Sequence, residues 1–318
     1  MLRPYSNRSP SYALGVLDVA LLGCGGTVPL PGRWLSALLV RLGPELILFD
    51  CGEGTQISMR ELGWGFKALK TICLSHLHAD HVAGLPGLLL TVGNSGRTEA
   101  VTILGPTGTT RAVEGLRTVA ANLPYEVVIL ELSGGEEIAQ ASARLACLPL
   151  DHRVPCLAYR LDVARGRQFE PDRARALGVP LELWKRLQQG ESVEWNGERA
   201  QPNDVLGPER PGLRLAYVTD TRPTARLPAF VQNADLLVCE ATYADPADAE
   251  NAVENKHMLF SEAAQIACEA SAQQLWLTHF STKLTDPEAH IGHARTVFAN
   301  TIVGRDHLTT TLRFRDRV

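Results

Sequence analysis

Four potential metal ligands lie within six positions of the stretch LSHLHADHVAGLPG, namely His76, His78, Asp80 and His81. Imidazole nitrogens and carboxylate oxygens suit zinc and similar divalent cations. Because side chains two apart in an extended segment share a face, His76 and His78 can bind one metal together. After a bend in the chain, Asp80 and His81 can reach a second point nearby. Single histidines in loops are usually solvated, but this spacing after an apolar run predicts a metal centre.

Three more candidate ligands follow apolar runs elsewhere: His152 in LACLPLDHRVP, Asp220 in LRLAYVTDTRP and His279 in QLWLTHFS. Each alone is a weak signal, since an aspartate can cap a helix or turn and a histidine can be hydrogen-bonded within a core. All three share one setting, a polar side chain directly after a strand-like run. This shared setting predicts that they complete the same site.

Short apolar runs followed by turn residues recur along the chain and predict strands of about 4–8 residues. Helical patterns alternate with many of them, and after the histidine cluster a helix is expected to begin near Val82 or Gly84. The class predicted is α/β with a mixed sheet or sheets. Residues 163–212 are rich in Arg, Pro, Gly and Gln and break the rhythm, so they are expected to form an insertion. The helical patterns lie at about 54–62, 84–93, 107–121, 172–179, 181–189, 261–271 and 286–298.

Composition narrows the class of protein. The chain has 318 residues, 45% of them hydrophobic, which is enough for one large domain or two modest ones. A net charge of −4 gives no overall basic field for nucleic acid, although a local basic patch remains open. Seven scattered cysteines without a CxxC pair indicate reduced thiols and a cytoplasmic protein.

The beginning of the chain has two interpretations. Arginines, an apolar stretch and then LLGC, ending at Cys24, resemble a lipoprotein signal. However, Asp18 interrupts the apolar stretch, and the same residues predict a strand that runs into a glycine-rich loop. We favour the strand. No run approaches the ~20 apolar residues of a membrane span, so no membrane association is expected.

The motifs together resemble the metallo-β-lactamase superfamily, and more closely its ribonuclease Z branch, the tRNA 3′-processing endonucleases. HxHxDH alone would fit many hydrolases of the superfamily, whereas FDCGEGTQ combined with ADHVAGLPGLL is much narrower. The resemblance spans nearly the whole chain. It rests on LGCGGTVPLPGR, LILFDCGEGTQ, LSHLHADHVAGLPGLL, LGPTGTTR, GVPLELWKRLQQGESVEWNGE, YVTDTRP, CEATY, HMLFSEAA and LTHFS.

The resemblance implies a four-layer αβ/βα sandwich, with two mixed β-sheets face to face and helices outside. Residues 1–318 would form a single domain, with 163–212 as an inserted substrate-binding arm. It also implies two zinc ions per chain, with manganese or iron as possible substitutes. The implied ligands are His76, His78 and His152 on the first ion, Asp80, His81 and His279 on the second, and Asp220 bridging both.

Such a centre implies a mechanism for cutting a phosphodiester. Two cations ~3.5–4 Å apart bind a water, lower its pKa and clamp the phosphate, and the hydroxide attacks phosphorus in line. Asp80 would orient that water. His257, in NKHMLFSEAA, matches the acid that protonates the leaving 3′ oxygen, with Glu240 of CEATY nominated to hold its imidazole. Without the resemblance, His257 would be interpreted as a surface residue near a helix start.

The substrate is the point at which this chain departs from its relatives. Leu181-Glu182-Leu183-Trp184 stands where the arm usually carries a Gly-Pro element, although Lys185 and Arg186 remain for phosphate contacts. Lys283 stands where relatives often have arginine. We expect removal of the 3′ trailer of precursor tRNA by a homodimer, with no DNA partner. A phosphodiesterase for small or cyclic diesters that uses the same dinuclear site is the alternative.

Overall fold

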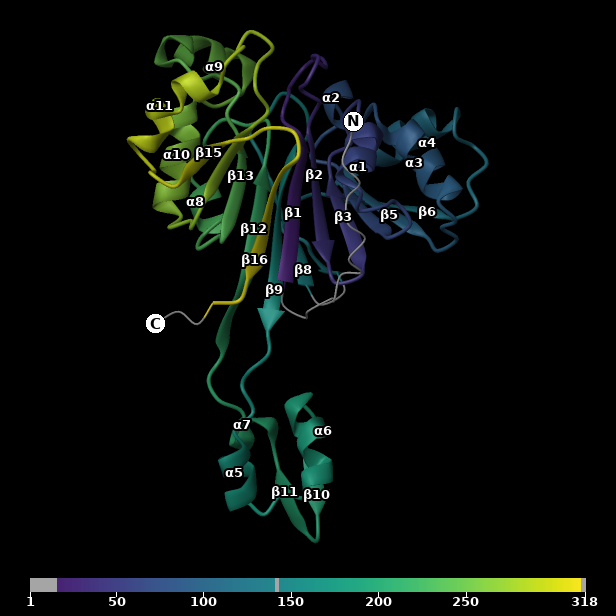
Figure 1. Cartoon of the computed structure of the whole chain (residues 1–318), viewed down its shortest axis with the longest axis vertical. Helices are drawn as coiled ribbons and strands as arrows, with labels where there is room; N and C mark the ends of the chain where they lie inside the picture. The colour runs from purple at the N-terminus through teal and green to yellow at the C-terminus, as the bar shows by residue number, and fades with distance from the viewer. Residues whose placement is uncertain (1–15, 141–142, 316–318) are drawn as a thin grey trace, which may run out of the picture. The chain divides into compact units, whose positions relative to one another are not determined.

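Two seven-stranded mixed sheets form the frame of the chain in a computed structural model, which describes residues 16–140 and 143–315 (Figure 1). In the first sheet the order is β16-β1-β2-β3-β4-β5-β6. Neighbours from β16 to β3 are antiparallel, and those from β3 to β6 are parallel. The strands are β1 (Val16–Gly23), β2 (Ala37–Leu42), β3 (Glu45–Phe49), β4 (Leu69–Cys73), β5 (Val101–Pro106), β6 (Val127–Leu132) and β16 (Leu308–Arg313).

The second sheet has the order β15-β14-β13-β12-β9-β8-β7. Strands β12 to β15 are parallel neighbours, whereas β7, β8 and β9 form an antiparallel meander. Its strands are β7 (Glu137–Gln140), β8 (Ala143–Pro149), β9 (Leu157–Arg165), β12 (Arg210–Val218), β13 (Leu236–Glu240), β14 (Leu275–Thr278) and β15 (Thr301–Val303).

The inner faces of the two sheets share a core, and helices cover the outer faces. Phe49 of the first sheet lies 5.9 Å from the ring of Tyr159 and 5.7 Å from that of Tyr217, both in the second sheet. Helices α1 (Thr55–Leu62), α3 (Leu85–Asn94) and α4 (Thr109–Arg117) pack on the first sheet, and α8 (Leu227–Phe230) and α10 (Phe260–Glu269) lie beside the second (Figure 1). The predicted αβ/βα sandwich is confirmed.

Residues Ala164–Gly212, with the described residues after Arg313, form a second compact unit. The phenyl ring of Phe169 lies 5.1 Å from the indole of Trp184, and Trp184 Nε1 donates to the carbonyl of Val179 (2.9 Å). Small apolar residues around this pair give the unit a core of its own. Its elements are α5 (Pro171–Ala176), η1 (Leu181–Leu183), α6 (Trp184–Gln188), β10 (Val193–Trp195), β11 (Glu198–Ala200) and α7 (Pro202–Val205).

The helix expected to begin near Val82 or Gly84 is α3, which starts at Leu85 with Gly84 as its N-cap. A short helix that was not expected, α2 (Ala79–Val82), precedes it, so Asp80 and His81 lie within a helical turn. One expectation about helices was wrong. The long helix expected over 286–298 is instead two short turns, η3 (Glu288–His290) and α11 (Gly292–Arg295). Glycine at 292 weakens a continuous helix here. Strand β1 (Val16–Gly23) covers the last part of the stretch that resembled a signal, and the arginines before it lie outside the described residues. Among the described residues, no helix is long and apolar enough to cross a membrane.

The cysteines predict a simple chemical behaviour. All seven are free, six are buried and Cys268 is exposed. Burial raises the pKa of the thiols of Cys51, Cys73 and Cys239, which keeps them protonated and unreactive. Titration of the native protein with a disulfide reagent is therefore expected to show one fast thiol, and seven in denaturant. Two or more fast thiols in the native protein would contradict this packing.

Candidate metal centre

The predicted ligands meet where strands of both sheets end. His76 follows β4 of the first sheet. His152, Asp220 and His279 follow β8, β12 and β14 of the second. The carboxyl ends of strands in such sheets are the usual place for ligand sites, because the side chains of the loops there are not needed to fill the hydrophobic core.

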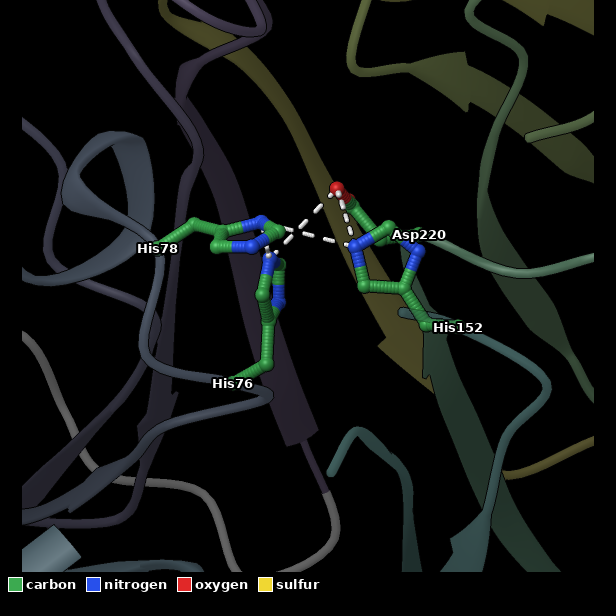
Figure 2. Close-up of side chains that lie close together, drawn as sticks. All are labelled: His76, His78, His152 and Asp220. Carbon is green, nitrogen blue, oxygen red and sulfur yellow. Dashed lines mark hydrogen bonds and ion pairs between the residues drawn. The ribbon is translucent and has the colours of Figure 1, made fainter. Parts of the chain in front are cut away.

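The first cluster joins His76, His78, His152 and one oxygen of Asp220, whose side chains point toward one another (Figure 2). Nε2 of His76 lies 3.0 Å from Nδ1 of His78, and Nε2 of His152 lies 3.4 Å from that same atom. The Oδ2 atom of Asp220 is 3.5 Å from His76 Nε2 and 3.8 Å from His152 Nε2.

The second cluster joins Asp80, His81 and His279. Nε2 of His81 and Nε2 of His279 are 3.2 Å apart, and Oδ2 of Asp80 lies 3.4 Å from His279 Nε2. The other oxygen of Asp220, Oδ1, lies 3.4 Å from His81 Nε2 and 3.3 Å from His279 Nε2. One carboxylate therefore faces both clusters, with one oxygen toward each.

These distances and this donor set fit bound cations. A tetrahedral cation with bonds of about 2.0–2.1 Å holds its donors about 3.3 Å apart, close to the separations within each cluster. Burial lowers the pKa of His76, His78 and His152, so these imidazoles are neutral and have a lone pair to offer. Burial opposes ionisation of Asp220, yet the surrounding histidines, His279 first, hold the pKa of its carboxyl well below its ordinary value.

A buried aspartate that the sequence interpretation missed orients the second cluster. Asp50 Oδ2 lies 2.8 Å from Nδ1 of His81 and accepts hydrogen bonds from the hydroxyls of Ser75 (2.8 Å) and Tyr217 (2.9 Å). This contact fixes His81 so that Nε2 faces the centre. The FDCGEGTQ motif contains Asp50, but its partners lie far away in the sequence, so only the fold reveals the role.

His279 and His152 are anchored in the same way, by the ring nitrogen that faces away from the centre. Nδ1 of His279 lies 3.1 Å from the Thr242 hydroxyl, and Nδ1 of His152 lies 3.3 Å from the carbonyl of Lys256. Both His279 (φ 59°) and Asp220 (φ 34°) adopt left-handed backbone conformations, which cost energy for residues with a Cβ. Such strain concentrates at functional sites.

The glycine loop after β1 makes room for His279. A Cβ on Gly26 would lie 2.6 Å from Cε1 of His279, so only glycine fits there. At the end of this loop, the amide of Thr27 donates to Oδ2 of Asp80 (2.6 Å). Gly26 is thus explained by its close approach to the centre.

His257 and Glu240 form a pair beside the two clusters. Nδ1 of His257 lies 3.1 Å from Oε1 of Glu240, and its ring stacks on His279 with centroids 5.3 Å apart. Nε2 of His257 faces Oδ2 of Asp220 at 4.0 Å. Burial opposes a charge on His257, but the carboxylate of Glu240 raises the pKa of its imidazole above the ordinary value. A protonated imidazole beside the centre can act as an acid.

The three predicted substrate contacts are exposed. Lys185 and Arg186 lie on α6 of the second unit, where Arg186 pairs with Glu191 (2.9 Å). Lys283 follows His279 by four residues and lines a cleft with Tyr243 and Ser281. No side-chain hydrogen bond or ion pair involves Lys185 or Lys283 among the residues that the structure describes.

Known proteins are similar in sequence to this chain over nearly its whole length. The chain is 45% identical over 303 residues to the ribonuclease Z of Clostridium kluyveri, covering 95% of this chain and 100% of that protein. It is 44% identical to the ribonuclease Z of Lachnoclostridium phytofermentans, covering 94% and 99%. The chain belongs to the ribonuclease Z family. The predicted membership is confirmed, and with it the class of enzyme, a hydrolase of the endonuclease type.

Family models and solved structures agree with the ribonuclease Z fold. Residues 17–108 match the model described as anti-Pycsar protein Apyc1, and residues 186–280 match the beta-lactamase superfamily domain. The structure of human tRNase Z, short form, superposes with a TM-score of 0.67 at 22% identity, covering 92% of this chain and 98% of that one. The metallo-beta-lactamase fold protein YhfI from Bacillus subtilis also gives 0.67, at 20% identity, covering 93% and 99%.

Proposed function

We propose that this chain removes the 3′ trailer of precursor tRNA with the two side-chain clusters described above. Family membership supports the reaction. The observation that carries the assignment to these residues is Asp220, whose two oxygens face separate groups of histidines. A single structural metal would not need a carboxylate shared in this way.

Two zinc ions per chain are the proposed cofactors, and manganese or iron could replace them with the same ligands. His76, His78 and His152 would hold the first ion, and Asp80, His81 and His279 the second, with Asp220 shared. Bound there, the cations would supply Lewis-acid stabilisation of the phosphate charge and a water with a pKa near neutrality. Elemental analysis of the purified protein tests both the identity and the number.

Side chains of this chain would accept the proton of the attacking water and donate a proton to the leaving group. Asp80 is ionised, because its hydrogen bond with His279 and the charge of His81 outweigh the effect of burial and hold the pKa of its carboxyl below the ordinary value. An ionised Asp80 at the centre can orient the attacking water and accept its proton. His257, held by Glu240, would donate a proton to the leaving 3′ oxygen.

Replacing His257 with alanine is expected to slow precursor tRNA cleavage by about 10²–10⁴-fold, the usual contribution of a positioned acid. Hydrolysis of bis(p-nitrophenyl) phosphate should fall far less, because p-nitrophenolate leaves without needing a proton. Rates with both substrates under single-turnover conditions make the comparison. His293→Ala, an exposed histidine on α11, is the matched control. Equal losses with the two substrates would remove His257 from the acid role.

Residues 163–212 are proposed as the arm that binds tRNA outside the cut site. Between residues 164 and 212, seven arginines and one lysine are balanced by eight acidic residues, so the arm has no net charge to attract RNA. Arg173, Arg175 and Arg186 are all paired with acidic neighbours. Lys185, which has no such partner among the described residues, is the readiest phosphate contact.

Replacing Lys185 with alanine is expected to weaken precursor tRNA binding about threefold to tenfold and to reduce the slope of log affinity against log salt by about one. Filter binding across a salt series measures both. Arg175→Ala, paired with Asp172, is the control and should change the slope less. An unchanged slope for Lys185→Ala would place the phosphate contacts elsewhere.

The homodimer and the cytoplasmic location stay predictions, and sedimentation analysis tests the first.

A further inference from the structure

A polar cleft of about 280 Å³ lies next to the predicted centre, within the larger unit of the chain. The segment after β13 lines it with Tyr243. The loop after β14 lines it with Lys283, and helix α9 (Ala249–Asn255) lines it with Asn251 and Asn255. The remaining lining residues are Thr242, Ala244, Asp245, Asp248, Ser281, Leu284 and His290.

The cleft walls are held in place by hydrogen bonds. Arg33 donates to the carbonyl of Leu284 (2.8 Å) and to that of Ser281 (3.4 Å), which fixes the loop that carries Lys283. On the other side, the amide of Asn255 donates to the Tyr243 hydroxyl (2.9 Å) and orients its ring. The cleft is therefore built before any ligand arrives.

The cleft lies beside the proposed acid. The ring of Tyr243, which lines the cleft, lies 6.4 Å from that of His257. The hydroxyl of Thr242, another lining residue, lies 3.1 Å from Nδ1 of His279, the ring nitrogen that faces away from the centre. A group that protonates a leaving oxygen must touch the nucleotide that carries this oxygen. That nucleotide lies on the His257 side of the centre, which is the side where the cleft lies.

We propose that this cleft binds the nucleoside whose 3′ oxygen is released, the last nucleotide of the mature tRNA, and so makes cleavage depend on the base at that position. The proposal rests on the proposed function. Tyr243 offers an aromatic face for the base, and base–aromatic stacking is sequence-tolerant. Asp245 and Asp248 can accept hydrogen bonds from exocyclic amino groups. Lys283, whose side chain has no partner within the described part of the chain, can bind the phosphate on the 5′ side of this nucleotide.

The test compares two precursor tRNAs that differ only in the last mature nucleotide, which carries either its base or an abasic ribose. With wild-type enzyme, loss of the base is expected to lower kcat/KM about tenfold or more, the usual effect of losing one stacked base. Asn251→Trp fills the cleft from α9 and should reduce this ratio toward one. Val253→Trp, on the same helix but outside the cleft and 57% exposed, should keep the wild-type ratio.

The possible outcomes distinguish a failure of the cleft proposal from a failure of the proposed function. If wild-type enzyme cuts the abasic precursor as fast as the complete one, the cleft does not hold the base and the proposal fails, whatever the variants do. A ratio that Asn251→Trp leaves at the wild-type value would place base recognition elsewhere and also overturn it. Wild-type enzyme that cuts neither precursor would contradict the proposed function itself.

Discussion

Replacing Asp220 with alanine is expected to reduce precursor tRNA cleavage at least about a thousandfold, because several kcal/mol of metal-derived charge stabilisation depend on this residue. Asp220 is 2% exposed, and each of its oxygens faces a different cluster of histidines. Its removal takes one donor from both proposed cation sites at once.

Two measurements check the prediction for Asp220. Elemental analysis is expected to show that the variant loses metal from both sites, and the cleavage assay should show the fall in rate. Asp172→Ala, on the exposed surface of the second unit, is the control and should keep both. A variant that retains two metals and cuts within tenfold of wild type would show that Asp220 does not join the clusters.

Replacing Glu240 with glutamine is expected to damage both stability and activity. Glu240 is fully buried, and Oε1 and Oε2 receive hydrogen bonds from the amides of Thr221 (2.7 Å) and Met258 (3.1 Å). The amide (3.2 Å) and hydroxyl (2.8 Å) of Thr242 also donate to Oε2, and the imidazole of His257 lies 3.1 Å from Oε1. The NH₂ group of a glutamine would face N–H and O–H groups that now donate to the carboxylate, and an N–H group cannot accept its hydrogen bond. The negative charge that balances a protonated His257 would also be lost.

The expected loss for Glu240→Gln is about 3–5 kcal/mol in the free energy of unfolding, the range for breaking a buried ion pair. Cleavage of precursor tRNA should fall about 10²–10⁴-fold in the fraction that stays folded, as His257 loses its partner. Denaturant unfolding and single-turnover cleavage measure the two effects. Glu250→Gln, exposed on α9, is the matched control. An unfolding free energy within 1 kcal/mol of wild type would refute the buried pair.

The close sequence spacing of the first four ligands made the site predictable, because HxHxDH after a strand places several donors together whatever the rest of the fold does. The prediction of His152, Asp220 and His279 as ligands also assumed that the strands before them end at one edge of the fold. In the structure β4 of one sheet and β8, β12 and β14 of the other end beside the centre. The roles of Asp50 and Thr242 could not be predicted, since their contacts exist only after folding.

Apolar runs in the sequence predicted most of the strands, and the errors in the predicted secondary structure lie where such runs are absent. Strands buried on both faces, such as β4 and β13, are continuous apolar segments and were predicted directly. Helix α9 and the hairpin β10–β11 were missed, because they are short and mostly polar and depend on their surroundings. Helix α9 lines the proposed nucleoside cleft, and so does the turn η3, which stands where a longer helix was expected.

The most direct test of the central claim is cleavage of an end-labelled precursor tRNA carrying a 3′ trailer, with and without chelator, by protein of known metal content. We predict one cut, directly after the last mature nucleotide, that disappears with chelator and returns when zinc is added. Protein with two metals bound per chain that leaves the precursor intact would contradict the assignment of tRNA as substrate.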